Sequence, residues 1–488
     1  MTIVLFAVVA LLVLTLLVLV HRWLWIRLVR DTTTPGSGIR RTGTALAFAL
    51  PLLSLAALVA GRAGAPFWLE RTVAWPGYLW LAVLLYLSLA MLLAEPVRTL
   101  WLRRQNRPGS QPDGPPAAEG ATAPGSASEP RRAGADTAGP GAQHQSVPAA
   151  AGADATGSGA EPQSREGAGR GSAPQATLEA TPEPAAPTGQ HDPAEATPAE
   201  ADPGQPAPAA AGPSTLSRRR FARIVAATAA ATTAGTVGYG TYGVLRGPRV
   251  KRVQVPLAKL PRAAHGFRIA VVSDIHLGPI LGRAHTTRIV DTINRTQPDL
   301  IAIVGDLVDG SVHDLAPAAE PLRGLRARHG SYFVTGNHEY FSGAQQWVDH
   351  VRELGLTPLE NARRELPHFD LAGVNDIAGE SEGHGPDFQA ALGDRDRARS
   401  AVLLAHQPVV IDEAVRYGAD LQLSGHTHGG QLWPGEYVAE LANPTVAGLE
   451  RYGDTQLYVS RGAGAWGPPV RVGAPSDITV VELASYQA

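Results

Sequence analysis

Five short polar clusters hold the residue types of this 488-residue sequence that could do chemistry, and each comes directly after an apolar stretch. They contain five of its 15 histidines and several acids, and they are Asp274-Ile275-His276, Gly305-Asp306, Gly336-Asn337-His338-Glu339, His406 and Gly425-His426-Thr427-His428-Gly429-Gly430. Gathering so many imidazoles and carboxylates at strand ends costs free energy unless a cation neutralises and ligates them. The clusters therefore predict a metal site.

The spacing within the clusters predicts how the side chains would reach metal. In an extended chain, residues i and i+2 point the same way, about 7 Å apart. Asp274 and His276 can therefore close on one ion from the same side, while His426 and His428 can each reach a different ion if two ions lie about 3.5–4 Å apart. A carboxylate such as Asp306 can bridge both. Glycines before Asp306, Asn337 and His426 permit the sharp turn or positive φ that such a ligand needs.

The composition limits which metal and which partners are expected. The chain has no cysteine, which excludes disulfides, thiolate catalysis and cysteine-ligated zinc or iron–sulfur sites. The remaining nitrogen and oxygen donors suit Mn, Fe or Zn and disfavour a site for calcium alone. A formal net charge of −2 gives no reason to expect nucleic acid as a partner.

Apolar stretches alternate with amphipathic ones from about residue 250 onward, and these would position the clusters. Strands are predicted over 267–273, 300–304, 332–335, 402–405 and 421–423, helices over 283–296, 316–328 and 345–354, and antiparallel strands in the tail over 457–460 and 479–483. Within the first helix Ile289, Val290 and Ile293 share one face. This alternation predicts a layered α/β domain with polar loops at the strand ends.

The clusters extend into five ordered motifs. They are SDIH (Ser273–His276), VGDLVD (Val304–Asp309), TGNHEY (Thr335–Tyr340), AHQP (Ala405–Pro408) and SGHTHGGQ (Ser424–Gln431). On these motifs, and on the closing stretch Leu457–Leu483, the sequence resembles the calcineurin-like metallophosphoesterase superfamily, and within it the bacterial membrane-associated branch of phosphohydrolases. The resemblance covers residues 267–483.

The resemblance implies a fold, a pair of metal ions and a role for each motif residue. The fold is a β-sandwich flanked by helices. The first ion would be held by Asp274, His276 and His428, with Asp306 bridging, and the second by Asn337, His406 and His426. His338 would be the catalytic residue that faces the scissile phosphate and would not ligate metal.

A hydrolytic mechanism follows from these assignments. Two such ions lower the pKa of a bridging water, so hydroxide is available near neutral pH to attack phosphorus in line. His338 would stabilise the developing charge or protonate the leaving alkoxide. Asp309 or Glu339 would orient His338, or else both are solvated loop acids.

Four large side chains near the motifs have two interpretations each. Arg461 and Arg471 would contact a phosphate or lie on the surface. Trp433 and Trp466 would line a rim that accepts lipid or pack in the core.

Three apolar stretches predict transmembrane helices over 3–20, 44–60 and 78–94. Arginine is concentrated in the first connection and after the third span, and it is sparse in the second connection. The positive-inside rule therefore places the N-terminus outside and the first connection in the cytoplasm. A cleaved signal peptide fits less well, because no basic residue precedes the first span.

The segment after these spans is rich in Ala, Pro and Gly and is acidic, so it is predicted to be a disordered linker over 105–215. It is followed by Ser217-Arg218-Arg219-Arg220-Phe221-Ala222-Arg223, which resembles a twin-arginine export signal although it is internal. The alternative is a basic patch before a fourth membrane helix. Both interpretations place the rest of the chain outside.

The predicted organisation has four parts: a membrane region (1–104), the linker (105–215), the twin-arginine-like motif with a fourth membrane helix (216–249) and a metallophosphoesterase catalytic domain (250–488). The predicted function is metal-dependent hydrolysis of a phosphomonoester or phosphodiester of lipid or envelope origin, on the extracytoplasmic side of the cell membrane. The alternative is a membrane sensor or scaffold whose metal domain binds a phosphorylated ligand without turnover.

Overall fold

The computed structural model describes residues 2–105 and 217–486. The described residues belong to one compact unit. Apart from Gln105, the linker predicted over 105–215 lies outside the described residues.

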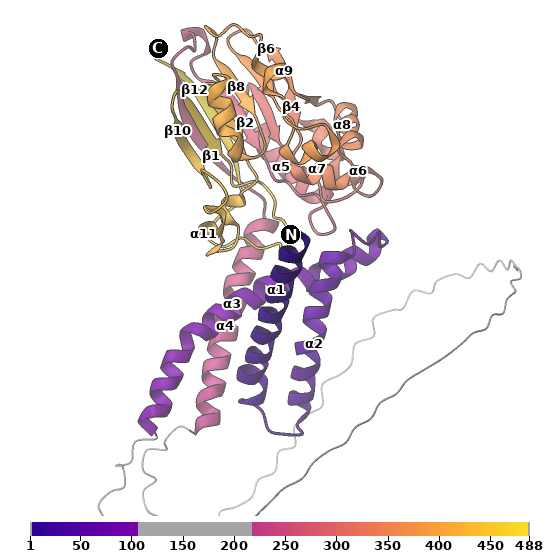
Figure 1. Cartoon of the computed structure of the whole chain (residues 1–488), viewed down its shortest axis with the longest axis vertical. Helices are drawn as coiled ribbons and strands as arrows, with labels where there is room; N and C mark the ends of the chain where they lie inside the picture. The colour runs from indigo at the N-terminus through magenta and orange to yellow at the C-terminus, as the bar shows by residue number, and fades with distance from the viewer. Residues whose placement is uncertain (1, 106–216, 487–488) are drawn as a thin grey trace, which may run out of the picture. The chain divides into compact units, whose positions relative to one another are not determined.

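Two six-stranded mixed sheets form the body of the C-terminal domain (Figure 1). The first has the order β1 (Arg249–Leu257), β12 (Asp477–Ser485), β2 (Phe267–Val272), β3 (Leu300–Val304), β4 (Ser331–Val334), β5 (Thr357–Pro358). The second has the order β10 (Gly448–Tyr452), β11 (Thr455–Val459), β9 (Leu421–Ser424), β8 (Ala401–Leu404), β7 (Asp370–Gly373), β6 (Ala362–Glu365). Strands β2, β3 and β4 are parallel to one another, and so are β7, β8 and β9.

Alternate residues of the central strands face two different cores. In β2, Ile269 and Val271 pack with residues of the second sheet such as Leu421 and Leu423, whereas Ala270 and Val272 face away from that sheet. Since both faces are buried, the strands read as continuous apolar runs. The packed sheets confirm the predicted β-sandwich.

Helices cover the outer face of each sheet. The first sheet is covered by α5 (Arg283–Arg295), α6 (Val312–Ala319) and α8 (Ala344–Glu353), and the second by α9 (Phe388–Leu392) and α10 (Ile411–Arg416). The predicted face of α5 is buried.

The helix predicted over 316–328 was misplaced. The structure starts α6 at Val312, where Ser311 accepts a hydrogen bond from the backbone N–H of Asp314, and it continues only as a 3₁₀ turn over Glu320–Gly324. The cap, rather than the apolar periodicity, sets where this helix begins.

The two tail strands each have an antiparallel partner, but they lie in different sheets. β11 pairs antiparallel with β10 and parallel with β9, whereas β12 pairs antiparallel with β2 and parallel with β1. Strand β1 was not predicted, because its half-exposed residues lack the apolar run that marks the central strands.

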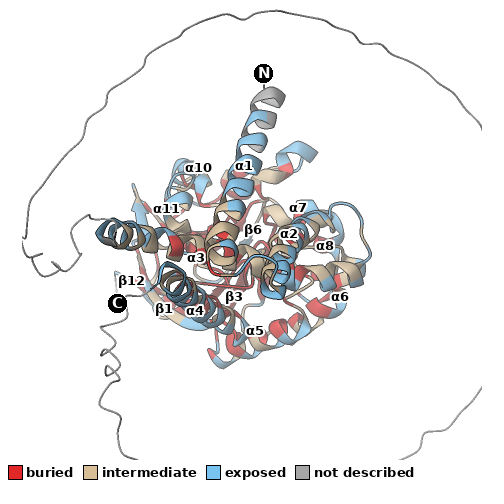
Figure 2. Cartoon of the chain, turned by 90° about the horizontal axis from the view of Figure 1, so that it is seen from below, coloured by how far each residue is buried: buried red, intermediate tan, exposed pale blue. Residues whose placement is uncertain are grey.

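The N-terminal part consists of long helices: α1 (Thr2–Trp25), continued by a π-helical segment over Ile26–Arg30, α2 (Gly38–Val59) and α3 (Phe67–Gln105). By length and composition, three helices of the described chain could cross a membrane, and they are these three. Much of α1 presents apolar side chains to the exterior, as expected for contact with lipid (Figure 2).

Helix α4 (Arg218–Leu245) begins on the twin-arginine-like motif and is capped by Ser217. It packs along α3, where Val237 lies with Ala82 and Tyr86. Its ring contact with α3 is a stack of Phe221 on Trp101, with centroids 4.1 Å apart. Both its role as a fourth membrane helix and its use as an export signal stay predictions.

Candidate metal centre

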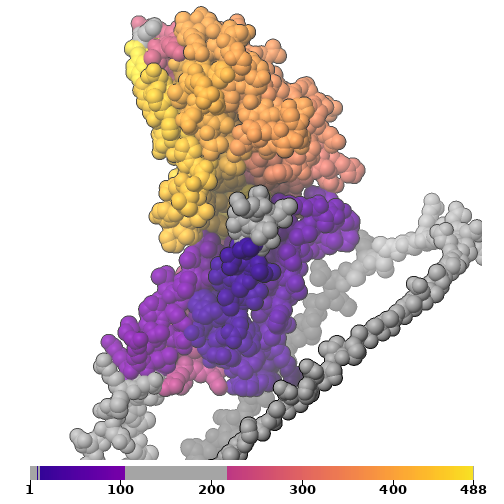
Figure 3. Space-filling view, viewed as in Figure 1, coloured from indigo at the N-terminus to yellow at the C-terminus, as the bar shows by residue number. Residues whose placement is uncertain are grey.

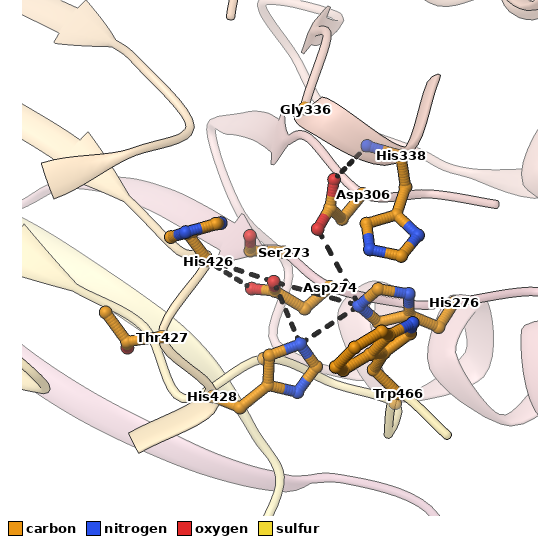
Figure 4. A network of polar contacts seen from close by, with 12 residues as sticks. Ser273, Asp274, His276, Asp306, Gly336, His338, His426, Thr427, His428 and Trp466 are labelled. Atoms are coloured by element: carbon orange, nitrogen blue, oxygen red, sulfur yellow. Dashed lines mark hydrogen bonds and ion pairs between the residues drawn. The ribbon is translucent and has the colours of Figure 1, made fainter. Parts of the chain in front are cut away.

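Parallel strands bring the five polar clusters to one edge of the sandwich. Asp274 and His276 follow β2, Asp306 follows β3, Asn337 and His338 follow β4, His406 follows β8, and His426 and His428 follow β9. The carboxyl ends of parallel strands meet at one edge of a sheet, which explains how residues so far apart in the chain come together (Figure 4). All eight predicted site residues lie in this one place.

The backbone at the site is strained. Left-handed φ angles occur at Asp274 (52°), His276 (49°), Asp306 (52°), His426 (72°) and His428 (54°). Each such residue costs about 1–3 kcal/mol. The surrounding fold therefore holds the backbone of these five residues in conformations that an unconstrained chain rarely adopts.

The preceding glycines serve mainly close packing. Of the three glycines expected to relieve the turn, Gly305 has a positive φ (75°), whereas Gly336 and Gly425 do not. A Cβ at Gly336 would lie 2.3 Å from Asp306 Oδ1, and one at Gly425 would lie 1.8 Å from Ser273 Oγ. These two positions lack a side chain because neighbouring loops pass through the space that it would fill.

The first group of donors consists of Asp274, His276 and His428, all buried. The Nε2 atoms of His276 and His428 lie 3.0 Å apart, and His428 Nε2 lies 3.3 Å from Asp274 Oδ1 (Figure 4). Three donors thus face one small volume.

The second group consists of Asp306, His406 and His426, with Asn337 beside it. His406 Nε2 lies 3.2 Å from Asp306 Oδ2, and His426 Nδ1 lies 3.0 Å from Asn337 Oδ1. Asp306 Oδ2 is also 3.8 Å from His276 Nε2, so this carboxylate stands between the two groups.

His338 lies beside Asp306 and belongs to a third possible group of donors, with His276 and Asp306. Its backbone N–H donates to Asp306 Oδ1 at 2.9 Å, and its ring Nδ1 lies 2.7 Å from Asp309 Oδ1. The side chain keeps 15% of its surface exposed, with the ring of Trp466 5.7 Å away. His338, Asn337 and His426 are the members of the site that are partly exposed.

Asp309 contacts both His276 and His338, so it is not the solvated loop acid of the alternative interpretation. Its Oδ1 lies 2.9 Å from His276 Nδ1 as well as 2.7 Å from His338 Nδ1. Burial alone would raise the pKa of Asp309, but the two histidines outweigh it and lower that pKa to about 2. Asp309 therefore remains a carboxylate that orients both rings.

Glu339 is fully buried, and it orients the backbone rather than His338. Its carboxylate accepts hydrogen bonds from the N–H groups of Asp306, Leu307 and Gly336, at 3.0, 2.8 and 2.6 Å. Burial, followed by the charge of Asp306, raises the pKa of Glu339 to about 7 against these hydrogen bonds. Glu339 thus holds the loop that presents Asp306.

Arg471 neither contacts the substrate side of the site nor lies on the surface. It is buried behind His428, where Nη1 donates to the carbonyl of His428 at 3.0 Å and Nε donates to the carbonyl of Gly464 at 2.7 Å. Its place in the site was missed, because 43 residues separate it from His428 and no motif joins them. Arg461 is half-buried against Gly429.

Neither tryptophan packs in the core. Trp433 is 46% exposed and Trp466 is 52% exposed. Trp466 borders the opening beside His338, as a rim residue would.

The donor set fits divalent metal. His406 Nδ1 lies 2.9 Å from the carbonyl of Val304 and donates to it, which directs the lone pair of Nε2 inward. Buried Nε2 makes no hydrogen bond among the described residues, although Asp306 Oδ2 lies 3.2 Å from it. Burial would lower the pKa of His276, but Asp309, Asp306 and Asp274 raise it to about 9. Buried carboxylates thus place negative charge next to inward-facing imidazoles, and a bound dication would neutralise this charge.

Comparison with known proteins agrees with this geometry. Residues 267–430 match the calcineurin-like phosphoesterase family. The chain is 39% identical over 259 residues to the transmembrane protein with metallophosphoesterase domain of Danio rerio, covering 50% of this chain and 59% of that one. It is 34% identical over 240 residues to an uncharacterized metallophosphoesterase of Aquifex aeolicus, covering 48% of this chain and 91% of that one.

The chain belongs to the calcineurin-like metallophosphoesterase family, which confirms the resemblance in the motifs. A third relative, from Bacillus subtilis, is 31% identical over 238 residues, covering 46% of this chain and 82% of the relative. A protein of the same name from Bos taurus is also 39% identical to this chain. The chain spans less than two thirds of the length of the Danio rerio and Bos taurus proteins.

Proposed function

We propose that this chain is a membrane-anchored phosphoesterase that uses two divalent ions, Mn, Fe or Zn, to hydrolyse a phosphomonoester or phosphodiester. The position of Asp306 carries the proposal, since its Oδ2 lies 3.8 Å from His276 Nε2 and 3.2 Å from His406 Nε2. In this assignment one ion is held by Asp274, His276 and His428, the other by Asn337, His406 and His426, and Asp306 serves both. When bound, such ions supply activated water and neutralise phosphoryl charge.

His338 would donate a proton to the leaving group. Asp309 engages its Nδ1, so Nε2 is the ring atom that remains to meet a substrate oxygen. Held in this orientation, the ring can donate a proton from Nε2 to the departing alkoxide. The rings of Trp466 and Phe341 lie 5.7 and 5.6 Å from that of His338, and both side chains are largely exposed.

This arrangement favours turnover over the alternative of a sensor that only binds a phosphorylated ligand. Binding a phosphate requires the ions alone, whereas the pairing of His338 with Asp309 adds an oriented acid that a binding site does not need. Tight binding of phosphoesters without hydrolysis of any of them would favour the sensor.

The membrane helices support an extracytoplasmic site in a multi-pass protein of the cell membrane. Residues of the connection between α2 and α3, which is poor in arginine, line the same cavity as His338. The opposite ends carry the arginines, including Arg27 and Arg98, both paired with Glu95. By the positive-inside rule, the connection and the site lie outside the cytoplasm.

A site at this surface suits a lipid or envelope phosphoester. The segment around α11 (Gly435–Ala439) projects from the catalytic domain (Figure 3). It adds an exposed apolar group, with Tyr437, Val438 and Leu441 58%, 69% and 87% exposed. Apolar side chains of this kind bind membrane interfaces.

The test is hydrolysis of an aryl phosphate and an aryl phosphodiester by the purified full chain. We expect activity that EDTA abolishes and added Mn restores, and that falls at least about 100-fold in Asp306→Ala and His428→Ala. His384→Ala, which alters an exposed histidine outside the site, should retain full activity. Wild-type rates in both site variants would refute the proposal.

A further inference from the structure

A cavity of about 480 Å³ lies beside the metal centre and is walled by two parts of the chain. On one side it is lined by the site residues His276, Asp309 and His338, with Trp466 at its border. On the other side it is lined by Ala57, Leu58, Gly61, Arg62, Ala74 and Tyr78 of α2, α3 and their connection. The catalytic residues therefore do not enclose this space by themselves.

Direct contacts hold the second wall against the first. Phe67, the first residue of α3, packs on the apolar cluster beneath α6 and α8. The ring of Tyr78 lies 3.7 Å from the position of a Cβ on Gly467, next to Trp466, and its hydroxyl donates to the carbonyl of Ala57 at 3.0 Å. One tyrosine thus links α2, α3 and the border of the catalytic site.

The cavity lies at the level expected for lipid headgroups. Helix α3 has 39 residues, which makes it roughly 58 Å long, well beyond the roughly 30 Å of the hydrocarbon core. The span predicted within this helix begins at residue 78, so the turns before it, which line the cavity, extend past the hydrocarbon. Leu58 lines the cavity and is 41% exposed, and Leu55, one turn earlier on α2, is 57% exposed, so apolar surface continues from the cavity toward the bilayer.

We infer that the α2–α3 connection, with the adjoining turns of both helices, forms part of the substrate site, and that the substrate is an amphiphilic phosphoester. Its phosphate reaches His338 and the metal centre, while its apolar chain lies along Leu58 and Ala74 toward the bilayer. This rests on the proposed function, because it assigns the substrate class of the same site. It also gives the membrane helices a role in recognition besides anchoring.

The experiment compares two phosphonates that cannot be hydrolysed, methylphosphonate and octylphosphonate. Their affinities for the Mn-loaded full chain in lipid nanodiscs are measured from the paramagnetic relaxation of the ³¹P nucleus, which requires no turnover. We expect octylphosphonate to bind at least about tenfold more tightly, since each buried methylene favours binding. In Leu58→Ser this ratio should fall at least about threefold, with the affinity for methylphosphonate unchanged.

Leu46→Ser is the matched control, since Leu46 is an exposed leucine about three turns earlier on the same helix and does not line the cavity, and it should keep the wild-type ratio within about twofold. Equal affinities for the two phosphonates, or equal effects of the two substitutions, would overturn the inference while leaving the metal site intact. Failure of the Mn-loaded chain to relax methylphosphonate would instead overturn the proposed function, and with it this inference.

Discussion

At the scale of single residues, the carboxylate of Asp309 links a predicted metal ligand to the predicted catalytic residue. It contacts the Nδ1 atoms of both His276 and His338, so it fixes which nitrogen of each ring faces the site. Partners of this kind set the orientation and basicity of metal-bound histidines. We regard Asp309 as a positioning residue that acts through these two rings.

Replacing Asp309 by Asn should lower kcat about 10–100-fold at saturating metal, because a neutral amide holds the ring of His338 in its orientation less firmly than the carboxylate does. The affinity for metal should fall as well, since the partner of His276 is weakened. Kinetics over a metal titration separate the two effects. Asp349→Asn, an exposed site on α8, is the control. An Asp309→Asn enzyme with wild-type kcat would show that the contact to His338 is not used.

Among the secondary-structure elements, the strand ends bring the site residues together, and most of these ends could be predicted from the sequence. Buried strands appear in a sequence as apolar runs, so β2, β3, β8 and β9 and the polar residues after them could be predicted. The position of Arg471 behind His428 could not, because it depends on a loop that returns to the site from far along the chain. Short or half-exposed strands such as β1 and β6 also carry too little apolar pattern to be recognised.

The loop after β9 should not tolerate a side chain at position 425. In Gly425→Ala the new Cβ would meet Ser273 Oγ at 1.8 Å and Asp274 Oδ2 at 2.4 Å, so β2 and β9 must move apart. We expect the Tm of the full chain to fall by about 3–10 °C and metal binding to weaken. Thermal unfolding followed by tryptophan fluorescence measures this. Gly324→Ala, where the Cβ meets only Val290 at 3.5 Å, should leave the Tm nearly unchanged, and equal shifts would contradict the packing described.

At the scale of the whole molecule, the arginine distribution and the contacts of α4 point to the same orientation. Arg223 near the start of α4 donates to the carbonyl of Thr32, in the arginine-rich connection between α1 and α2. At the other end, the carbonyl of Gly240 accepts a hydrogen bond from the backbone N–H of Arg471 in the catalytic domain. Helix α4 therefore runs from the basic side of the helices to the catalytic side.

The absence of cysteine makes this orientation easy to test. Single cysteines replace Ser381, exposed in the catalytic domain, or Thr34, exposed in the α1–α2 connection. A maleimide that cannot cross membranes should label Ser381→Cys in intact cells and Thr34→Cys only after permeabilisation, because the positive-inside rule puts them on opposite sides. The reverse pattern would place the catalytic domain in the cytoplasm.

We propose that one carboxylate, Asp306, serves two metal ions. Electron paramagnetic resonance of the full chain loaded with Mn tests it directly, since two ions bridged by a shared ligand give an exchange-coupled signal. We predict a coupled pair at two Mn per chain, which is lost in Asp306→Ala. A signal from isolated Mn alone in the wild-type chain at saturation would contradict the account.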